Sequence, residues 1–198
     1  MNVSDQDIES TLAATRENAL LANLRALAEG LIALAVLALV LNQLFALVPI
    51  TDGGMAPSLP GGRSVLSTRL TYQLRPPKRG EIVLLNNPAD PERQLARRVV
   101  GLPGETLELR GVQVAINGRP LVEPYVTAQL QGVVPISATS RFALPPGEYF
   151  VMSDNRAGAP AVLDRAPVRV NQLAGRAWLV VFPTDALSVI DQTGGRAP

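Results

Sequence analysis

The chain changes its hydrophobic pattern once, at Pro49. Before it, the nineteen residues from Gly30 to Val48 are almost all apolar, on every side of a helix and not along one stripe. At about 1.5 Å per residue such a helix is roughly 28 Å long, close to the ~30 Å hydrocarbon core of a bilayer. We predict a transmembrane helix over residues 30–48. A buried helix of a soluble protein is the alternative interpretation.

The region before this run is long and rich in acidic residues. This argues against a cleaved signal peptide, which begins with a short, positively charged region. Ser4 to Asp7, followed by Ile8, is typical of a capping box that opens a helix. We predict an amphipathic helical segment over residues 1–29 that continues into the membrane span. The flanking charges do not decide which way the span is oriented.

After Pro49 the pattern changes to short runs of β-forming residues separated by Gly and Pro. Asn117-Gly118 follows one of these runs and indicates a hairpin turn. Residues 49–190 are therefore predicted to form one mainly β domain, followed by a frayed tail over 191–198. The pattern is weakest from Gln129 to Arg141. The predicted strands lie at 64–67, 81–85, 106–109, 112–116, 148–152 and 177–182.

The composition excludes several kinds of chemistry. The net charge is +1, which gives no reason to expect a nucleic-acid partner. The chain has no cysteine and no histidine, which removes thiolate nucleophiles, disulfides, the usual general base and the commonest metal ligand. We expect no metal and no cofactor. The basic residues are seventeen arginines and one lysine, Lys78.

Four segments are more specific than the general pattern. They read DGGMAPSL at 52–59, PPKRGEIV at 76–83, RRVVGLPGE at 97–105 and YFVMSDNR at 149–156. In order and spacing these segments resemble the type I signal peptidase family, whose members are Ser/Lys dyad peptidases. The family's corresponding motifs are Ser-Met-x-Pro-Thr/Ser-Leu, Pro-Lys-Arg-Gly-Asp-Ile-Val, Lys-Arg-Val-Ile-Gly-Leu-Pro-Gly-Asp and Tyr-Phe-Val-Met-Gly-Asp-Asn-Arg.

The resemblance implies a signal-peptidase-type, mainly β domain preceded by one N-terminal transmembrane helix. It implies a single-pass protein of the cytoplasmic membrane, with the β domain on the outer or periplasmic side and secretory signal peptides as substrates. The glycines and proline of 101–104 are expected to form a structural turn that needs positive φ at glycine, and 154–156 a hydrogen-bonded turn. The positions that match the family's motifs are Met55, Pro57, Ser58, Arg98, Gly101, Pro103, Gly104, Asp154, Asn155 and Arg156.

The departures from the family's pattern fall on its catalytic positions. Gly54 stands where the nucleophilic serine is expected and has no hydroxyl to attack a carbonyl. Arg97 stands at the position of the lysine base, and its guanidinium stays protonated. Asp52 replaces an oxyanion-hole serine that some members have, and a carboxylate there would repel an oxyanion. The run over 157–163, where the family has a serine that orients the lysine, contains no hydroxyl.

Other groups could in principle substitute for the missing ones. Hydroxyls are present nearby at Thr51, Ser58 and Ser64, but the sequence offers them no base. Asp52 and Asp154 could act as an aspartic pair only if they share a proton at close range. Gly54 alone could be an engineered knock-out, whereas the parallel changes at Arg97 and over 157–163 favour natural decay.

These observations lead to one principal hypothesis. The chain is a membrane-anchored, catalytically inactive protein of the signal peptidase fold that serves as a structural or interaction subunit of a membrane protein complex. Its partners would be membrane lipid, through the helix, and other membrane protein subunits. The alternatives are a signal-peptide-binding pseudoenzyme that accepts an extended segment by strand addition, and a still-active serine endopeptidase that uses displaced groups.

Overall fold

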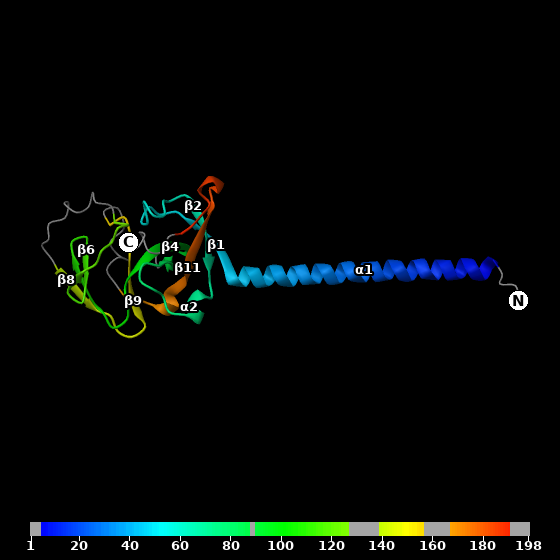
Figure 1. Ribbon diagram of the computed structural model, residues 1–198, viewed down its shortest axis with the longest axis horizontal. Coiled ribbons are helices and arrows are strands. Elements are labelled where there is room, and N and C mark those ends of the chain that lie inside the picture. The colour runs from blue at the N-terminus through cyan, green and yellow to red at the C-terminus, as the bar shows by residue number, and fades with distance from the viewer. Residues whose placement is uncertain (1–4, 88–89, 127–138, 157–166, 191–198) are drawn as a thin grey trace. The chain divides into compact units, whose positions relative to one another are not determined.

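The computed structural model describes residues 5–87, 90–126, 139–156 and 167–190. The chain divides into two compact units, Met1–Gln43 and Leu44–Pro198, and each is described by itself. The first is a single helix, and the second is mainly β (Figure 1).

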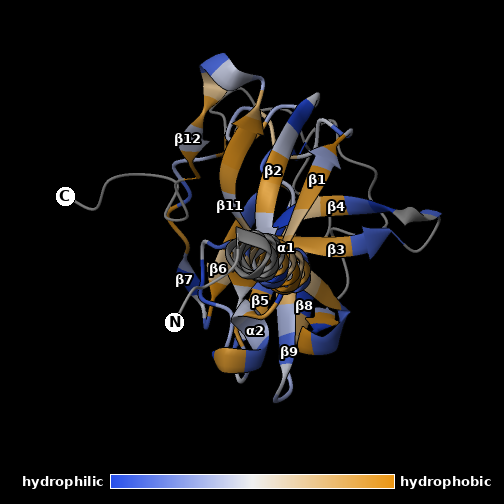
Figure 2. Ribbon diagram, turned by 90° about the vertical axis from the view of Figure 1, so that its right-hand side faces the viewer, coloured by the Kyte–Doolittle hydropathy of each residue, from blue (hydrophilic) through white to orange (hydrophobic). Residues whose placement is uncertain are grey.

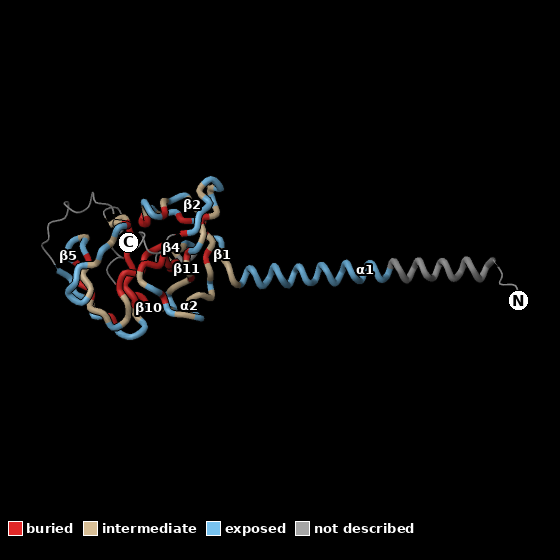
Figure 3. Tube along the Cα trace, in the orientation of Figure 1, coloured by how far each residue is buried: buried red, intermediate tan, exposed pale blue. Residues whose placement is uncertain are grey.

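The described part of the first unit is the helix α1, which spans Asp5–Leu44. Its last residue, Leu44, already belongs to the second unit. Its segment Leu21–Leu44 is long and apolar enough to cross a membrane, and the side chains described there are exposed along almost its whole length (Figure 3). A helix whose apolar side chains are not covered by its own protein is suited to a lipid environment. The chain therefore has one N-terminal helix that could span a membrane.

The prediction that this helix extends to Val48 is wrong. The helix ends at Leu44 and not at Val48, because the strand β1, Phe45–Ile50, begins at once. β1 pairs antiparallel with β2, Arg63–Thr68, from Phe45 opposite Thr68 to Ile50 opposite Arg63. Residues 45–48, the apolar end of the predicted span, form strand β1 instead. Val48 is buried in the sheet, and so is Ile50 at the end of the same strand.

The larger sheet of the second unit has the strand order β1-β2-β11-β3-β4-β9-β10, with β12 paired to β11. The strands pair antiparallel throughout the part of the chain that the structure describes, and the pairs include long-range ones such as β11 with β2 and β4 with β9. The predicted strands at 64–67, 148–152 and 177–182 are confirmed as parts of this sheet, and the one at 81–85 is confirmed from Ile82 onward. The remaining strands are β3 Ile82–Asn87, β4 Asp90–Gly101, β9 Glu148–Met152, β10 Pro167–Arg169, β11 Leu173–Phe182 and β12 Ser188–Val189.

The smaller sheet has the order β7-β6-β5-β8. In Figure 1 it lies at the end of the β unit away from β1 and β2. The predicted hairpin is confirmed, since Asn117 and Gly118 both have positive φ and join β6 to β7. In the weakly patterned stretch 129–141, only 139–141 belong to the described residues, and they lie in β8. The strands are β5 Thr106–Arg110, β6 Gln113–Ile116, β7 Arg119–Pro120 and β8 Thr139–Ala143.

Helical structure in the second unit is limited, among the described residues, to short turns: α2 Thr71–Leu74, η2 Val170–Gln172 and η3 Thr184–Ala186. The predicted tail at 191–198 lies outside the described residues. A mainly β unit with one N-terminal apolar helix is the fold class that the sequence predicts.

The two sheets share a core that includes a close contact at Gly101. A Cβ on Gly101 would lie 2.6 Å from Leu144 and 2.9 Å from Phe150, so a side chain there would collide with the cluster that joins β4, β5 and β9. The expectation of positive φ is met at Gly104, whose φ is 84°, but not at Gly101. Gly101 is therefore needed for packing, and Gly104 for the turn.

Candidate functional site

Gly54 lies in the loop that follows β1. The loop is anchored by Met55 and Leu59, which are fully buried in the core beneath β1, β2 and β11. The backbone N–H of Leu59 donates to the carbonyl of Met55 at 2.7 Å and closes a helical turn. Pro57 and Ser58 point to solvent on this turn. The motif at 52–59 is therefore a fixed turn that places Gly54 inside the protein.

A second loop holds this one in place. The backbone N–H of Asn155 donates to the carbonyl of Gly54 at 2.8 Å. The side-chain amide of Asn155 donates to the carbonyl of Gly53 at 3.3 Å. The motifs at 52–59 and 149–156 are thus brought together, with their backbones joined directly.

Arg97 approaches the same place from β4. Its side chain is only 1% exposed, and its Nη1 donates to Asp52 Oδ2 at 2.7 Å and to the carbonyl of Ala96 at 2.6 Å. Because a guanidinium stays protonated, this group is a fixed positive charge whose partner is the Asp52 carboxylate. The two residues form a mostly buried ion pair beside Gly54.

The space next to Gly54 is occupied by polar side chains. A Cβ built on Gly54 would lie 2.9 Å from Arg97 Nη1, 3.0 Å from Asp52 Oδ2 and 3.1 Å from Ser153 Oγ. All three distances are shorter than ordinary van der Waals contact. Any residue larger than glycine at position 54 must therefore displace at least one of these groups.

Ser153, which is 1% exposed, lies beside Gly54 and was not among the predicted site residues. The sequence does mark this position, because Ser153 stands where the family's motif Met-Gly-Asp-Asn-Arg has glycine. A hydroxyl is thus absent at position 54 and present at position 153, across the same small space.

Asp154 faces a different arginine. Arg98 donates to both of its oxygens, from Nε at 2.9 Å and from Nη2 at 2.6 Å, and both side chains are fully buried. Since Asp52 is bound to Arg97, each carboxylate has its own guanidinium. This arrangement does not favour an aspartic pair, which needs two carboxyl groups that share a proton.

The Arg98 pair continues toward the smaller sheet. The guanidinium carbon of Arg98 lies 4.1 Å from the centre of the Tyr125 ring, a cation–π contact. Burial, and then the charge of Glu123, raises the pKa of Tyr125, so its hydroxyl stays protonated and donates to Glu123 at 2.8 Å. Glu123 in turn pairs with Arg156. Asp154 and Arg156 of the motif at 149–156 are thus connected through Arg98, Tyr125 and Glu123 in one continuous buried network.

Three other candidate groups are not among the side chains nearest to a Cβ built on Gly54. Thr51 is exposed, Ser64 lies in β2, and Lys78 is exposed in the turn before β3. The run at 157–163 lies outside the described residues. Within the described residues, no three acidic, histidine or cysteine side chains are grouped to hold a metal ion.

The fold and the loops define a class: a mainly β domain with peptidase-type motifs gathered at one place, following a helix that could cross a membrane. The model of the signal peptidase family, peptidase S26, matches residues 24–182. The chain belongs to this family.

Individual relatives agree with the family match. The chain is 29% identical to a signal peptidase I of Bacillus amyloliquefaciens over 159 residues, which is 77% of this chain and 84% of the relative. It is 31% identical to signal peptidase I T of Bacillus subtilis (strain 168) over 132 residues, 63% of this chain and 68% of the relative. A solved signal peptidase I from Enterococcus faecalis is similar at 27% identity and a TM-score of 0.42, covering 52% of this chain and 97% of that one.

Proposed function

We propose that this signal-peptidase-like protein has no peptidase activity and serves as a structural or interaction subunit of a membrane protein complex. Family membership makes secretory signal peptides the class of substrate that an active form would cut. The proposal adds that positions 54 and 97, which correspond to the nucleophile and the base, have lost those roles in this chain.

The observation that carries the proposal is the Arg97–Asp52 ion pair beside Gly54. A serine peptidase needs a hydroxyl, a neutral base within hydrogen-bond reach, and donors aimed at the developing oxyanion. Position 54 offers no hydroxyl, Arg97 cannot accept a proton, and Asp52 contributes negative charge. The pair also occupies the space into which a side chain at position 54 would extend.

A role in a complex is supported by an apolar face on the larger sheet. Strand register places Leu47 opposite Leu66, Leu66 opposite Leu179, and Leu179 opposite Val189. Directly opposed residues share one face of a sheet. Figure 2 shows the hydrophobic character of β1, β2 and β11, which carry this row.

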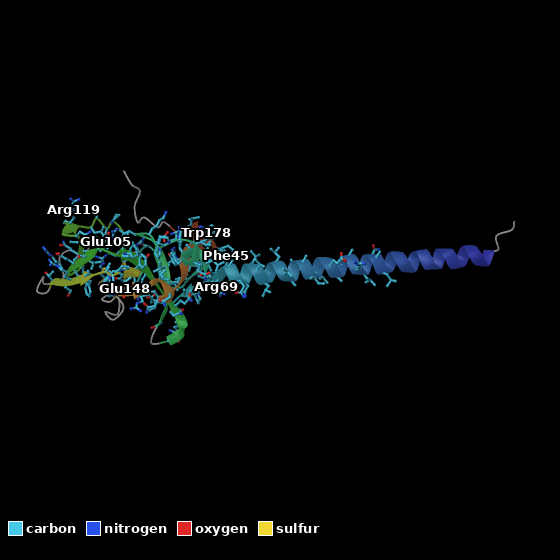
Figure 4. All side chains as sticks on the ribbon, turned by 90° about the horizontal axis from the view of Figure 1, so that it is seen from below. Phe45, Arg69, Glu105, Arg119, Glu148 and Trp178 are labelled. Carbon is cyan, nitrogen blue, oxygen red and sulfur yellow. The ribbon has the colours of Figure 1, made fainter. Side chains whose placement is uncertain are left out.

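The two ends of this row are strongly exposed. Leu47 is 61% exposed and Val189 67%, and Phe182, farther along β11, is 58% exposed. At one edge Phe45 and Trp178 lie side by side, with ring centres 6.5 Å apart (Figure 4). Apolar surface of this kind marks contacts with protein or with membrane. The proposal includes an outer-side location of this unit at the cytoplasmic membrane, which is supported by the resemblance to signal peptidases.

Two experiments test the proposal. The purified full chain in detergent is incubated with a secretory precursor under conditions in which a signal peptidase I cuts it; cleavage by this chain would overturn the inactivity. A mild-detergent affinity purification from the native membrane then tests the role. A partner at fixed ratio supports a subunit, whereas substoichiometric secretory precursors would instead indicate a signal-peptide binder.

A further inference from the structure

A cavity of about 400 Å³ lies in the smaller sheet. It is formed by the end of β5, the β6–β7 hairpin, the segment that follows β7, and Arg156. Neither Gly54 nor any of the three side chains packed beside it lines this cavity, so it is separate from the candidate site. Its volume falls in the range of roughly 300–1,000 Å³ typical of small-molecule sites.

One part of the wall is apolar, beside a polar part formed by Arg110, Gln113, Glu123 and Arg156. Val112, Val114, Leu121 and Val126 contribute aliphatic side chains. The backbone N–H of Leu121 donates to the carbonyl of Val114 at 2.9 Å, and this hydrogen bond holds these two residues next to each other. Such walls favour a ligand with a hydrocarbon body, because its burial removes apolar surface from water.

Two of the charged groups in the wall neutralise each other. Arg156 donates to both oxygens of Glu123, and the two side chains are only 4% and 7% exposed. Arg156 also donates to the carbonyl of Val112, so the pair is fixed to the turn before β6. A bidentate pair held this way is rigid and contributes no net charge to the cavity.

Arg110 is the third charged group of the lining, and because the other two cancel, the lining has a net charge of +1. Its carboxylate neighbour, Glu108, lies outside the lining and is shared with Arg141. The contact from Arg110 is the longer of the two, 3.4 Å against 2.8 Å. Arg110 is therefore the cation in this wall with the most freedom to meet a ligand anion.

The pair also has an unfilled hydrogen bond. Among the residues that the structure describes, the buried Nε of Arg156 has no acceptor, although buried polar groups nearly always have one. The wall formed by the described residues therefore has a net positive charge and no acidic side chain without a cationic partner.

We propose that this cavity binds a small apolar monocarboxylate, with its carboxylate against Arg110 and its hydrocarbon part against the aliphatic wall. The chemistry fits a free short-chain carboxylic acid or the C-terminal end of a short apolar peptide. A second negative charge on the ligand would have no second cation to meet, because Arg156 is paired with Glu123, and a cationic ligand is disfavoured by Arg110. The proposal does not depend on whether the chain is a peptidase.

The test uses the full chain in non-ionic detergent, with labelled Val and Leu methyl groups observed by NMR. Hexanoate and an N-acetyl-Leu-Val peptide with a free C-terminus are titrated separately, and hexanamide and the peptide amide are the uncharged controls. We expect saturable shifts of the methyl signals of Val112, Val114, Leu121 and Val126 with at least one acid, and much weaker ones with its amide. The acid that binds identifies the source of the carboxylate. Equal effects of acids and amides, or no saturation by either acid, would overturn the proposal.

A matched pair of variants tests the role of the charge. Arg110→Gln should weaken acid binding about fivefold, the loss expected for one partly exposed charged contact. Arg119→Gln removes an exposed arginine of the neighbouring β7 (Figure 4) that does not line the cavity, and should leave the affinity unchanged. If both variants bind as the parent does, or both weaken equally, Arg110 is not the anion's partner and the assignment fails.

Discussion

Arg97 on β4 and Asp52 in the loop after β1 are 45 residues apart in sequence and are joined by a 2.7 Å hydrogen bond between Nη1 and Oδ2. In the sequence these residues are two separate departures from a family motif. In the fold they compensate each other, because a buried guanidinium needs a carboxylate and a buried carboxylate needs a donor. The two residues therefore form one structural unit of the candidate site.

Gly54→Ala should destabilise the protein by about 1–3 kcal/mol, the usual range for overpacking. The new methyl group would lie 2.9 Å from Arg97 Nη1, and Arg97 has little room to move because it is 1% exposed and hydrogen-bonded. Gly53→Ala is the matched control, since nothing lies within 4 Å of a Cβ built there. The measurement is the free energy of unfolding of the β unit by denaturant. Equal stability of the two variants would show that the space beside Gly54 is open.

Asp52→Asn should also destabilise the protein, by about 1–3 kcal/mol. The amide keeps the shape of the side chain but removes the negative charge opposite Arg97, whose guanidinium remains charged. Thermal or denaturant unfolding of the variant measures the loss. The double variant Asp52→Asn/Arg97→Met should lose less than the sum of the two single changes, since it removes both charges together. Strict additivity would mean that the two groups do not stabilise each other.

How far the sequence predicts this fold depends on where each residue's partner lies. The runs at 106–109, 112–116 and 148–152 were predictable because β-forming residues and a nearby turn decide them locally. The position at which helix α1 ends could not be predicted in this way. Residues 45–48 are apolar enough for either a membrane helix or a strand, and the choice is made by pairing with β2, which lies farther along the chain.

The strand β4 shows the same limit for the site. Arg97 and Arg98 are consecutive charged residues, a pattern that does not indicate a buried strand, yet both are almost fully buried. Their burial is possible because Asp52 and Asp154 reach them from two other loops. The motif resemblance identified the positions, whereas the pairing, and the place of Ser153 beside Gly54, needed the three-dimensional structure.

The Arg98–Asp154 pair should be among the most costly to break. Asp154→Asn would leave the fully buried Arg98 without its carboxylate, at a cost of about 3–5 kcal/mol. Asp90→Asn is the control, because Asp90 forms a pair with Arg93 in which both side chains are substantially exposed; its effect should be within about 0.5 kcal/mol. Denaturant unfolding compares them. A small loss for Asp154→Asn would mean that water or another group replaces the carboxylate.

Glu81 should make the stability of the β unit depend on acid pH. Burial alone would raise its pKa, but hydrogen bonds from Arg75 and the Lys78 N–H, with the charges of Arg75 and Arg176, outweigh burial and lower it. In the unfolded chain a glutamate titrates near pH ~4.3. A carboxylate with a lowered folded pKa contributes stability that is complete above this value and is lost as the pH falls through the folded pKa.

Glu81→Gln removes this titration, so the variant should be less stable than the parent at neutral pH, and the difference should shrink as the pH falls below about 4. The neutral-pH loss follows from the 2.6 Å contact with Arg75, which would lose its carboxylate. Unfolding free energies of parent and variant between about pH 7 and pH 3 are the measurement. Two parallel curves over this range would show that Glu81 is not ionised differently in the folded and unfolded states. A converging pair would show that the buried cluster around Glu81 depends on its negative charge.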